Sequence, residues 1–422
     1  MKGVWGGRLG ASTVVACALI AASAAPSTAA VKKYHVNTRS DHKPGTCTKN
    51  DCTLREAVIA ANNPVFGGGK VVVPAAGKPY KLTRAGGNED AAKSGDLDIT
   101  DPNGVVVSGA GAKKTVIKQT KKDRIFDIPP DLTFPVSFEG VTLSGGNAGN
   151  DSGGGIRSMS NVTVFESVVR DNRAADGGGI AVEGSDGRLN LIVSTVRGNR
   201  AKLHGGGIEI VDGDDNSHGI LSSTIAANRA PQGGGIYALL GSEDFGLVTS
   251  TVTHNLSLGA DPPGVLVGGG GLYFESTLSG PGIVKIGQST IASNEGSGLA
   301  PTSARAANIY TEKTVQVENT LVALDLGGAP NCQGTFDSQG HNLDGGTTCG
   351  LDQGTDDENA TAGLKELADN GGLTQTRALK GTSDAIDEGT CPGTLIQRGV
   401  DQRGEGRPSV CDIGAFERDP LP

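Results

Sequence analysis

The side chains best suited to chemistry lie close together near the middle of the chain. Glu209 is followed by the segment VDGDDN, which contains Asp212, Asp214, Asp215 and Asn216. Two carboxyl groups can perform acid and base work on a glycosidic bond, which makes Asp214 and Asp215, with Glu209, candidate catalytic residues. Oxygen ligands at alternate positions can hold calcium, which makes Asp212, Asp214 and Asn216 candidate metal ligands.

The same segment has a simpler interpretation. The glutamate that closes a typical calcium loop is missing, and Ser223 stands in its place. Asp and Asn also form ordinary solvated turns, because their side chains hydrogen-bond the neighbouring backbone. The sequence therefore predicts no required cofactor and leaves calcium as an option.

Three of the five tyrosines follow an aliphatic residue in copies of one repeated motif. These are Tyr237, Tyr273 and Tyr310, and Glu209 has the equivalent position one copy earlier. If the copies stack, the tyrosines form one outward column whose aromatic faces could stack along sugar rings. The alternative is that like side chains stack only because adjacent copies are in register. We interpret the three as candidate carbohydrate-binding residues.

The sequence HGGGIEIV, beginning at His204, resembles an oxyanion-hole segment of lipases and esterases. However, triple glycine followed by an aliphatic residue recurs at 153–156, 177–180, 205–208, 233–236 and 269–272. No serine has glycine two positions before and two positions after it, so the nucleophile elbow of those enzymes is missing. The glycines belong to the repeat, and we expect His204 to occupy a variable, solvent-facing position.

A second motif alternates with the glycines. It reads STVRGN at 194–199, STIAAN at 223–228, STVTHN at 250–255 and STIASN at 289–294. The two motifs return together at intervals of roughly 28 residues, which defines one structural unit. Apolar residues alternate on either side of each motif, as expected for short half-buried strands. Each unit is predicted to be one coil of an all-β parallel β-helix, with coils about 4.8 Å apart.

The repeat residues have expected structural roles. The glycines should allow positive φ at a sharp corner where stacked backbones approach closely. The terminal asparagine should tolerate the left-handed conformation at a turn, and its amide should bond the asparagine of the next coil. The threonines of the second motif suit strands for steric reasons, and its serines should face inward.

The chain divides into four predicted segments. Residues 1–30 read as a signal peptide, 31–66 as an N-terminal cap, 67–330 as β-helix repeats and 331–422 as the last coils with a C-terminal cap. Cys17 lies in a lipid-attachment-like box, so a lipoprotein is the alternative. Within the cap, Thr53 and Glu56 fit a capping box that opens a short amphipathic helix.

The mature chain keeps six cysteines, clustered at its two ends. Their even number suits an exported protein, and the economical pairs are Cys47 with Cys52, Cys332 with Cys349 and Cys391 with Cys411. Zinc ligation is the competing interpretation, but paired knuckle spacings are missing. We expect three disulfides that hold the ends of the fold.

Charge and hydropathy exclude some classes of partner. The formal net charge is −9 and the isoelectric point is near 5.3, which argues against nucleic acid. No stretch after the signal is long and apolar enough to cross a membrane. We therefore expect a secreted protein that has no membrane span after signal cleavage. It should be soluble or associated with the cell surface.

Segments at both ends resemble known exported families. The sequence CTLREAVIAANN at 52–63 resembles the motif of the CSLREA family, with Thr53 in place of serine. LADNGGLTQTRAL at 367–379, DQRG at 401–404 and CDIGAFE at 411–417 are similar to the choice-of-anchor Q domain. The repeats also resemble those of polymorphic membrane proteins. These resemblances imply a right-handed parallel β-helix with capped ends and imply little about activity.

Three functions remain open at this point. The leading interpretation is a binder of an extracellular polymer, carbohydrate or another cell-surface component, through the tyrosine column. The second is a polysaccharide lyase or glycoside hydrolase of the pectin-degrading type, using the carboxylates near Asp214 and Asp215. The third is a structural or adhesive surface protein without a ligand site. Catalysis would require convergent acid, base and cation-binding groups, which the sequence does not place together.

Overall fold

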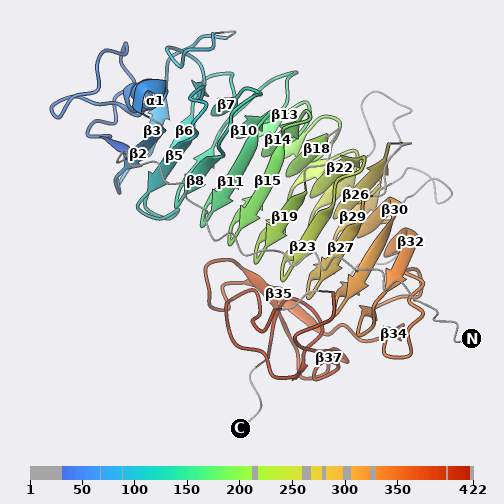
Figure 1. The fold of residues 1–422 in the computed structure, drawn as a ribbon. Coiled ribbons are helices and arrows are strands. Elements are labelled where there is room, and N and C mark those ends of the chain that lie inside the picture. The colour runs from blue at the N-terminus through green and yellow to red at the C-terminus, as the bar shows by residue number, and fades with distance from the viewer. Residues whose placement is uncertain are drawn as a thin grey trace, which may run out of the picture.

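The computed structural model describes residues 31–66, 68–87, 89–211, 217–258, 268–277, 282–297, 306–323, 329–395 and 398–418. Short strands in this part of the chain stack in parallel to form an elongated solenoid (Figure 1). The predicted parallel β-helix is confirmed. No helix among the described residues is long and apolar enough to cross a membrane.

Each central coil runs through two strands of the largest sheet, then one strand of a second sheet and one of a third. The largest sheet has 18 strands among the described residues. Its strands are β1 (Lys32–His35), β2 (Gly69–Val73), β4 (Leu97–Asp98), β5 (Val105–Gly109), β7 (Phe126–Ile128), β8 (Val136–Glu139), β10 (Ile156–Ser158), β11 (Asn161–Phe165), β14 (Ile180–Glu183), β15 (Arg188–Ile192), β18 (Ile208–Val211), β19 (His218–Leu221), β22 (Ile236–Leu240), β23 (Phe245–Val248), β26 (Leu272–Ser276), β27 (Val284–Gly287), β30 (Ile309–Glu318) and β32 (Cys332–Ser338).

The second and third sheets complete the coils, and two hairpins follow them. The second sheet contains β3 (Tyr80–Leu82), β6 (Val116–Gln119), β9 (Thr142–Ser144), β12 (Val168–Arg170), β16 (Thr195–Arg197), β20 (Thr224–Ala226), β24 (Thr251–Thr253), β28 (Thr290–Ala292), β31 (Leu321–Ala323), β33 (Leu343–Asp344) and β34 (Asp357–Glu358). The third contains β13 (Arg173–Ala174), β17 (Arg200–Ala201), β21 (Arg229–Ala230), β25 (Leu256–Leu258) and β29 (Glu295–Ser297). The hairpins pair β35 (Leu364–Ala368) with β36 (Thr376–Leu379), and β37 (Gly389–Thr390) with β38 (Val410–Cys411).

The glycine corners have the predicted geometry. Gly205 has φ +58°, which L side chains rarely adopt. A Cβ on Gly206 would lie 2.4 Å from the Gly234 carbonyl oxygen of the next coil, closer than atoms can approach. One glycine therefore makes the turn and the next allows the coils to stack.

The predicted asparagine ladder forms inside the solenoid. Each Asn Nδ2 donates to the Oδ1 of the next coil's asparagine, for example from Asn199 to Asn228 and from Asn228 to Asn255, both at 3.0 Å. The expected left-handed conformation of the asparagines was wrong. The positive φ falls on the preceding residue, such as Ala227 at 55° or His254 at 56°, because the asparagine must point inward to bond its neighbours.

The N-terminal end is closed as predicted by α1 (Leu54–Ala61), whose capping box joins Thr53 and Glu56. The stack itself begins earlier than expected, since β1 already pairs in parallel with β2. Arg55 is fully buried and donates to the carbonyls of Ala92, Gly95 and Asp96. These bonds satisfy backbone carbonyl groups in the segment that leads into β4, which pairs with β7 on one side only.

The C-terminal segment closes the fold differently from a simple end cap. After β34, residues 361–395 and 398–418 return along the flank of the second sheet, where Figure 1 shows them in red. Thr224 Oγ1 donates to the Gln375 carbonyl at 2.6 Å, and Thr251 Oγ1 donates to Gln402 Oε1 at 2.6 Å. The outer threonines of the repeat therefore serve as the docking surface for this C-terminal lobe.

All three predicted disulfides are present and exclude the zinc interpretation for these cysteines. Cys47 pairs with Cys52, Cys332 with Cys349 and Cys391 with Cys411. The first lies in the N-terminal cap, the second near the last coils and the third in the C-terminal lobe. They hold short loops at the ends of the solenoid, whereas the described central coils rely on ladders and core packing.

Candidate functional site

One outward row of the largest sheet collects side chains that can perform chemistry. Parallel register aligns nine residues, one on each coil, and we call them the central row. Its members are Asp98, Asp127, Arg157, Ala181, Glu209, Tyr237, Tyr273, Tyr310 and Gln333. The predicted alignment of Glu209 with the three tyrosines is confirmed.

The tyrosines do not present open ring faces, contrary to the expectation from the sequence. Tyr237, Tyr273 and Tyr310 are only 5%, 2% and 8% exposed. Their ring centroids lie 5.5 and 4.5 Å apart, so each ring covers the next. The cause is the coil spacing, which matches the separation of stacked rings. Carbohydrate binding by these residues stays a prediction and would use their hydroxyl edges.

The hydroxyl edges contact carboxylates. Tyr237 donates to Glu275 Oε2 at 2.6 Å, and Tyr310 donates to Glu312 Oε1 at 3.2 Å. Burial and then the bond to Glu275 raise the pKa of Tyr237 above its usual value. The tyrosine hydroxyl therefore keeps its proton at physiological pH.

A histidine that the sequence analysis treated as incidental joins this row. His204 lies before the glycine corner, and the corner brings it beside Glu209 and under the ring of Tyr237. Its ring stacks on Tyr237 with centroids 4.6 Å apart, and Nδ1 lies 3.9 Å from Glu209 Oε1. Sequence reasoning missed the contact because it followed only strand positions. The bridge from His204 to Gln232 shows that residues before the glycines form a row of their own.

Asp176, from the preceding coil, orients His204. One oxygen of Asp176, Oδ1, accepts from the His204 backbone N–H at 3.0 Å and lies 2.9 Å from ring Nδ1. This arrangement assigns the Nδ1 proton to the Asp176 contact and leaves Nε2 as the nitrogen available to accept a proton. Because the His204 side chain is 30% exposed, a ligand on the surface can reach it.

Glu209 is the most unusual group of the cluster. It is 4% exposed, and its Oε1 lies 3.9 Å from His204 Nδ1, beyond hydrogen-bonding distance. Burial, and then the charges of Asp176 and Glu183, raise the pKa of Glu209 to about 9. A carboxyl group in such surroundings remains protonated at neutral pH and can act as a general acid.

The atoms of Asp176, His204 and Glu209 that could bind a metal lie within 4.8 Å of one another. Mixed imidazole and carboxylate ligands suit transition metals. However, Asp176 Oδ1 already contacts two nitrogens of His204 at hydrogen-bonding distance. An acid–base arrangement therefore explains the geometry directly.

A second cluster lies three coils toward the N-terminus. Carboxylates of Asp96, Asp98 and Asp127 lie within 4.8 Å of one another, and Arg124 Nη1 is 3.6 Å from Asp96. Burial and the charges of Asp98 and then Asp123 raise the pKa of Asp96 to about 8. Burial raises that of Asp98 to about 7, despite the opposing bond from the Ala92 N–H. These oxygens could hold a hard cation, whose charge would compensate theirs.

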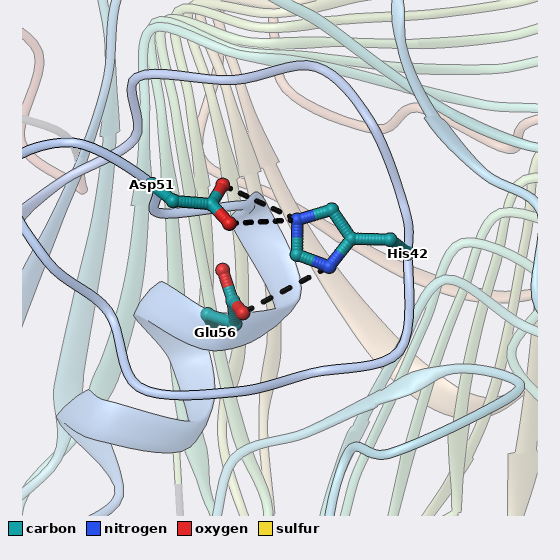
Figure 2. Close-up of side chains that lie close together, drawn as sticks. All are labelled: His42, Asp51 and Glu56. Atoms are coloured by element: carbon teal, nitrogen blue, oxygen red, sulfur yellow. Dashed lines mark hydrogen bonds and ion pairs between the residues drawn. The ribbon is translucent and has the colours of Figure 1, made fainter.

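A third cluster belongs to the N-terminal cap. Figure 2 shows His42 facing Asp51 on one side and Glu56 on the other. His42 Nε2 lies 3.2 Å from Asp51, and Nδ1 lies 4.0 Å from Glu56. Glu56 already accepts from the backbone N–H groups of Gly45 at 2.6 Å and Thr53 at 2.8 Å. This cluster therefore fastens the loop before α1 to the helix.

The remaining candidates from the sequence have no structural description. Asp212, Asp214, Asp215 and Asn216 lie outside the described residues, as does the predicted signal peptide. Their catalytic and calcium-binding roles stay predictions. Glu209, in contrast, lies in the described part of the chain and joins partners that the sequence did not indicate.

Comparisons with known proteins indicate the fold. No family model matches the chain, and no curated protein matches it, so the resemblances at the two ends stay predictions. Among solved structures, pectate lyase Pel9A is similar over 93% of this chain and 98% of its own, with 12% identity and a TM-score of 0.50. The A-module of the Azotobacter vinelandii mannuronan C-5 epimerase AlgE6 aligns over 72% and 97%, with 12% identity and a TM-score of 0.27. The pectate lyase likeness shows the parallel β-helix fold alone.

Proposed function

We propose that this protein is a glycoside hydrolase that cleaves an extracellular polysaccharide lying along the central row. The convergence of Asp176, His204 and Glu209 carries the proposal. Two consecutive coils bring together a buried carboxyl group with a raised pKa, a partly exposed imidazole and a carboxylate that orients it. A proton donor and a proton acceptor that lie side by side where a ligand can reach them are typical of acid–base catalysis.

In this proposal each group has one role. Glu209 donates its proton to the glycosidic oxygen as the bond from that oxygen to the anomeric carbon breaks. A water oxygen bonds to the anomeric carbon, and His204 Nε2 accepts the water proton. Asp176 stabilises the imidazolium that forms. The proton then returns from His204 to Glu209 through solvent, which completes the addition of one water molecule.

Hydrolysis accounts for the site better than elimination. Elimination from a uronate needs a cation to neutralise the sugar carboxylate. Arg157, the one cation of the central row, already contacts Asp127 at 3.3 Å and Glu183 at 3.2 Å. A carboxylated sugar would compete with both acids for it.

The fold and the ends of the chain support an extracellular role. Pectate lyase Pel9A bears the name of a polysaccharide-degrading enzyme and has the same fold. The three disulfides suit an oxidising compartment outside the cytosol. We therefore propose that the protein is secreted, as the predicted signal peptide suggests.

Binding without cleavage is the second candidate function. It is favoured by the row of hydroxyl and carboxylate edges at Tyr237, Glu275, Tyr310 and Glu312, which could hold sugar hydroxyl groups. A binder would retain a polysaccharide but release no products. The same experiment separates the two functions.

The test uses the purified full-length protein and a panel of neutral, amino-sugar and uronate polysaccharides. Reducing ends, unsaturated products and retention on each polymer are measured together. We expect new reducing ends without unsaturated products. Glu209→Gln should lower the rate by roughly 100-fold or more, as expected for loss of a general acid.

Glu139→Gln is the matched control, because Glu139 lies on the same sheet but pairs with Lys70 away from the cluster. It should keep the wild-type rate. Retention on a polymer with no product from the wild type would establish the binder instead. Unsaturated products would establish elimination.

A further inference from the structure

The charges beside the cluster restrict the polymer that this site can accept. Next to the central row, a neighbouring row aligns Glu183, Val211, Leu239 and Glu275 by parallel register. Glu312 follows one coil later, where the Ser276 N–H donates to it at 3.4 Å. In these two rows acidic side chains greatly outnumber the one cation, Arg157.

Arg157 cannot balance this surface. Its Nη1 lies 3.3 Å from Asp127, and its Nε lies 3.2 Å from Glu183. Its charge is thus shared between two carboxylates. On the other side of Glu209, the carboxylates of Glu275 and Glu312 have no cation on either row.

Glu275 and Glu312 are positioned to accept hydrogen bonds from a ligand. Each accepts one tyrosine hydroxyl, which fixes the carboxylate and leaves further acceptor capacity. Glu275 is half-buried and Glu312 is exposed. They lie on successive coils, about 4.8 Å apart along the axis, which is close to the length of one sugar unit.

The carboxyl group of Glu209 is the proposed proton donor beside these carboxylates. Glu209 is 4% exposed and its Oε1 lies 3.9 Å from His204 Nδ1, while its carboxyl oxygens are not among the buried side-chain atoms that lack a partner, so they keep hydrogen-bonding capacity toward the surface. Glu209 aligns with Tyr237 on the next coil, so a ligand that contacts Glu209 would lie at one end of the line of carboxylates formed by Glu275 and Glu312. The same polymer would then cross all three carboxyl groups.

We infer that the polymer cleaved at Glu209 is a cationic polysaccharide of amino sugars, whose ammonium groups pair with Glu275 and Glu312. The inference rests on the proposed hydrolase function. An ammonium group donates three hydrogen bonds and carries the charge that this edge lacks. A polyuronate would instead meet like charge along the whole edge, which lowers affinity.

The test compares three polymers in mildly acidic buffer: a glucosamine polymer, the same polymer fully N-acetylated, and polygalacturonate. We expect the glucosamine polymer to be cleaved at least ~10-fold faster than either of the others at limiting concentration, with an advantage that shrinks as salt rises. N-acetylation replaces the charged ammonium group by a neutral amide with one N–H, so it tests whether cleavage needs the ammonium group.

The double variant Glu275→Gln with Glu312→Gln keeps oxygens that can accept the tyrosine hydroxyls. We expect KM for the glucosamine polymer to rise ~5–20-fold while kcat changes little, because the change removes charge from a binding edge. Glu139→Gln should leave both constants unchanged. Equal cleavage of the N-acetylated polymer, or an unchanged KM in the double variant, would overturn the inference.

Failure of the two proposals can be told apart. If the glucosamine polymer is retained through Glu275 and Glu312 but is never cleaved, the hydrolase proposal fails and the ligand class holds. If a neutral polymer is cleaved through Glu209 with no preference for amino groups, the hydrolase holds and the ligand class fails. Thermal unfolding of every variant confirms that it is folded.

Discussion

At the residue scale, the raised pKa of Glu209 makes the stability of the fold depend on pH. Its pKa of about 9 lies above the usual value of 4.5. The folded protein therefore keeps a proton that the unfolded chain releases between about pH 4.5 and pH 9. The contribution of this residue to the unfolding free energy must fall as pH rises through that interval.

Replacing Glu209 should remove this pH dependence. Glutamine cannot ionise, so Glu209→Gln should gain ~1–3 kcal/mol of unfolding free energy relative to wild type between pH 5 and pH 9. Denaturant titrations at the two pH values measure the difference. Glu139→Gln should follow the wild type, and an equal pH response in Glu209→Gln would show that Glu209 ionises normally.

The orientation of His204 by Asp176 gives a second prediction at this scale. Asp176→Asn retains an acceptor for the backbone N–H but loses the charge that stabilises a protonated ring. We expect kcat to fall by roughly 10–1,000-fold with little change in KM. Steady-state kinetics on a cleaved polymer measures this effect. An Asp186→Asn variant, outside the cluster, is the control, and a change confined to KM would contradict the orienting role.

At the element scale, short strands are held by ladders more than by their own length. Strands of three residues such as β16 and β20 align because Asn199 and Asn228 bond through the interior. The helix α1 works differently, since Arg55 reaches from it to the backbone just before β4. The motif TLREA therefore has a structural explanation, in which its arginine donates hydrogen bonds to backbone carbonyls near the N-terminal end of the solenoid.

Arg55→Met tests that explanation. The substitution retains much of the side-chain length but removes the donor to the Ala92 and Asp96 carbonyls and one of the donors to the Gly95 carbonyl and the Asp41 carboxylate. We expect a loss of ~2–4 kcal/mol in unfolding free energy, as for other broken buried ion pairs. Denaturant unfolding measures it, and Arg39→Met on the exposed loop provides the control. A loss below ~0.5 kcal/mol would mean that water replaces the arginine.

At the scale of the whole molecule, the C-terminal lobe and the solenoid form one unit. Gln402 links them, because it accepts from Thr251 and its Nε2 donates to Thr224 at 3.0 Å. Arg407 and Glu417, in the C-terminal motif, lie 3.3 Å apart inside the lobe. The lobe therefore has its own polar interior and attaches through the outer threonines.

Gln402→Leu should loosen the lobe without unfolding the coils. The Thr251 hydroxyl loses its acceptor and the Thr224 hydroxyl loses one donor, although Thr224 keeps its bond to the Gln375 carbonyl, at a total cost of ~1–3 kcal/mol. We expect limited proteolysis within 361–418 to become faster, while the central coils stay protected in hydrogen exchange. Gln353→Leu, on an exposed turn, controls for added hydrophobicity. Unchanged proteolysis would show that other contacts suffice to hold the lobe.

The sequence by itself determined the coil. Its glycine runs, serine–threonine motifs and paired cysteines predicted the parallel β-helix, the capping helix, the three disulfides and the register of Glu209 with the tyrosines, because each depends on local spacing or on a period. The tertiary structure decided which side chains of neighbouring coils and segments come into contact and which surfaces stay open. Because the coil spacing matches the distance between stacked rings, each tyrosine ring covers the face of the next. The turn at the glycines brings His204 close to Glu209. The folding back of residues 361–418 covered the threonines. None of these contacts follows from spacing along the chain, since each joins residues of different coils or segments through the packing between them.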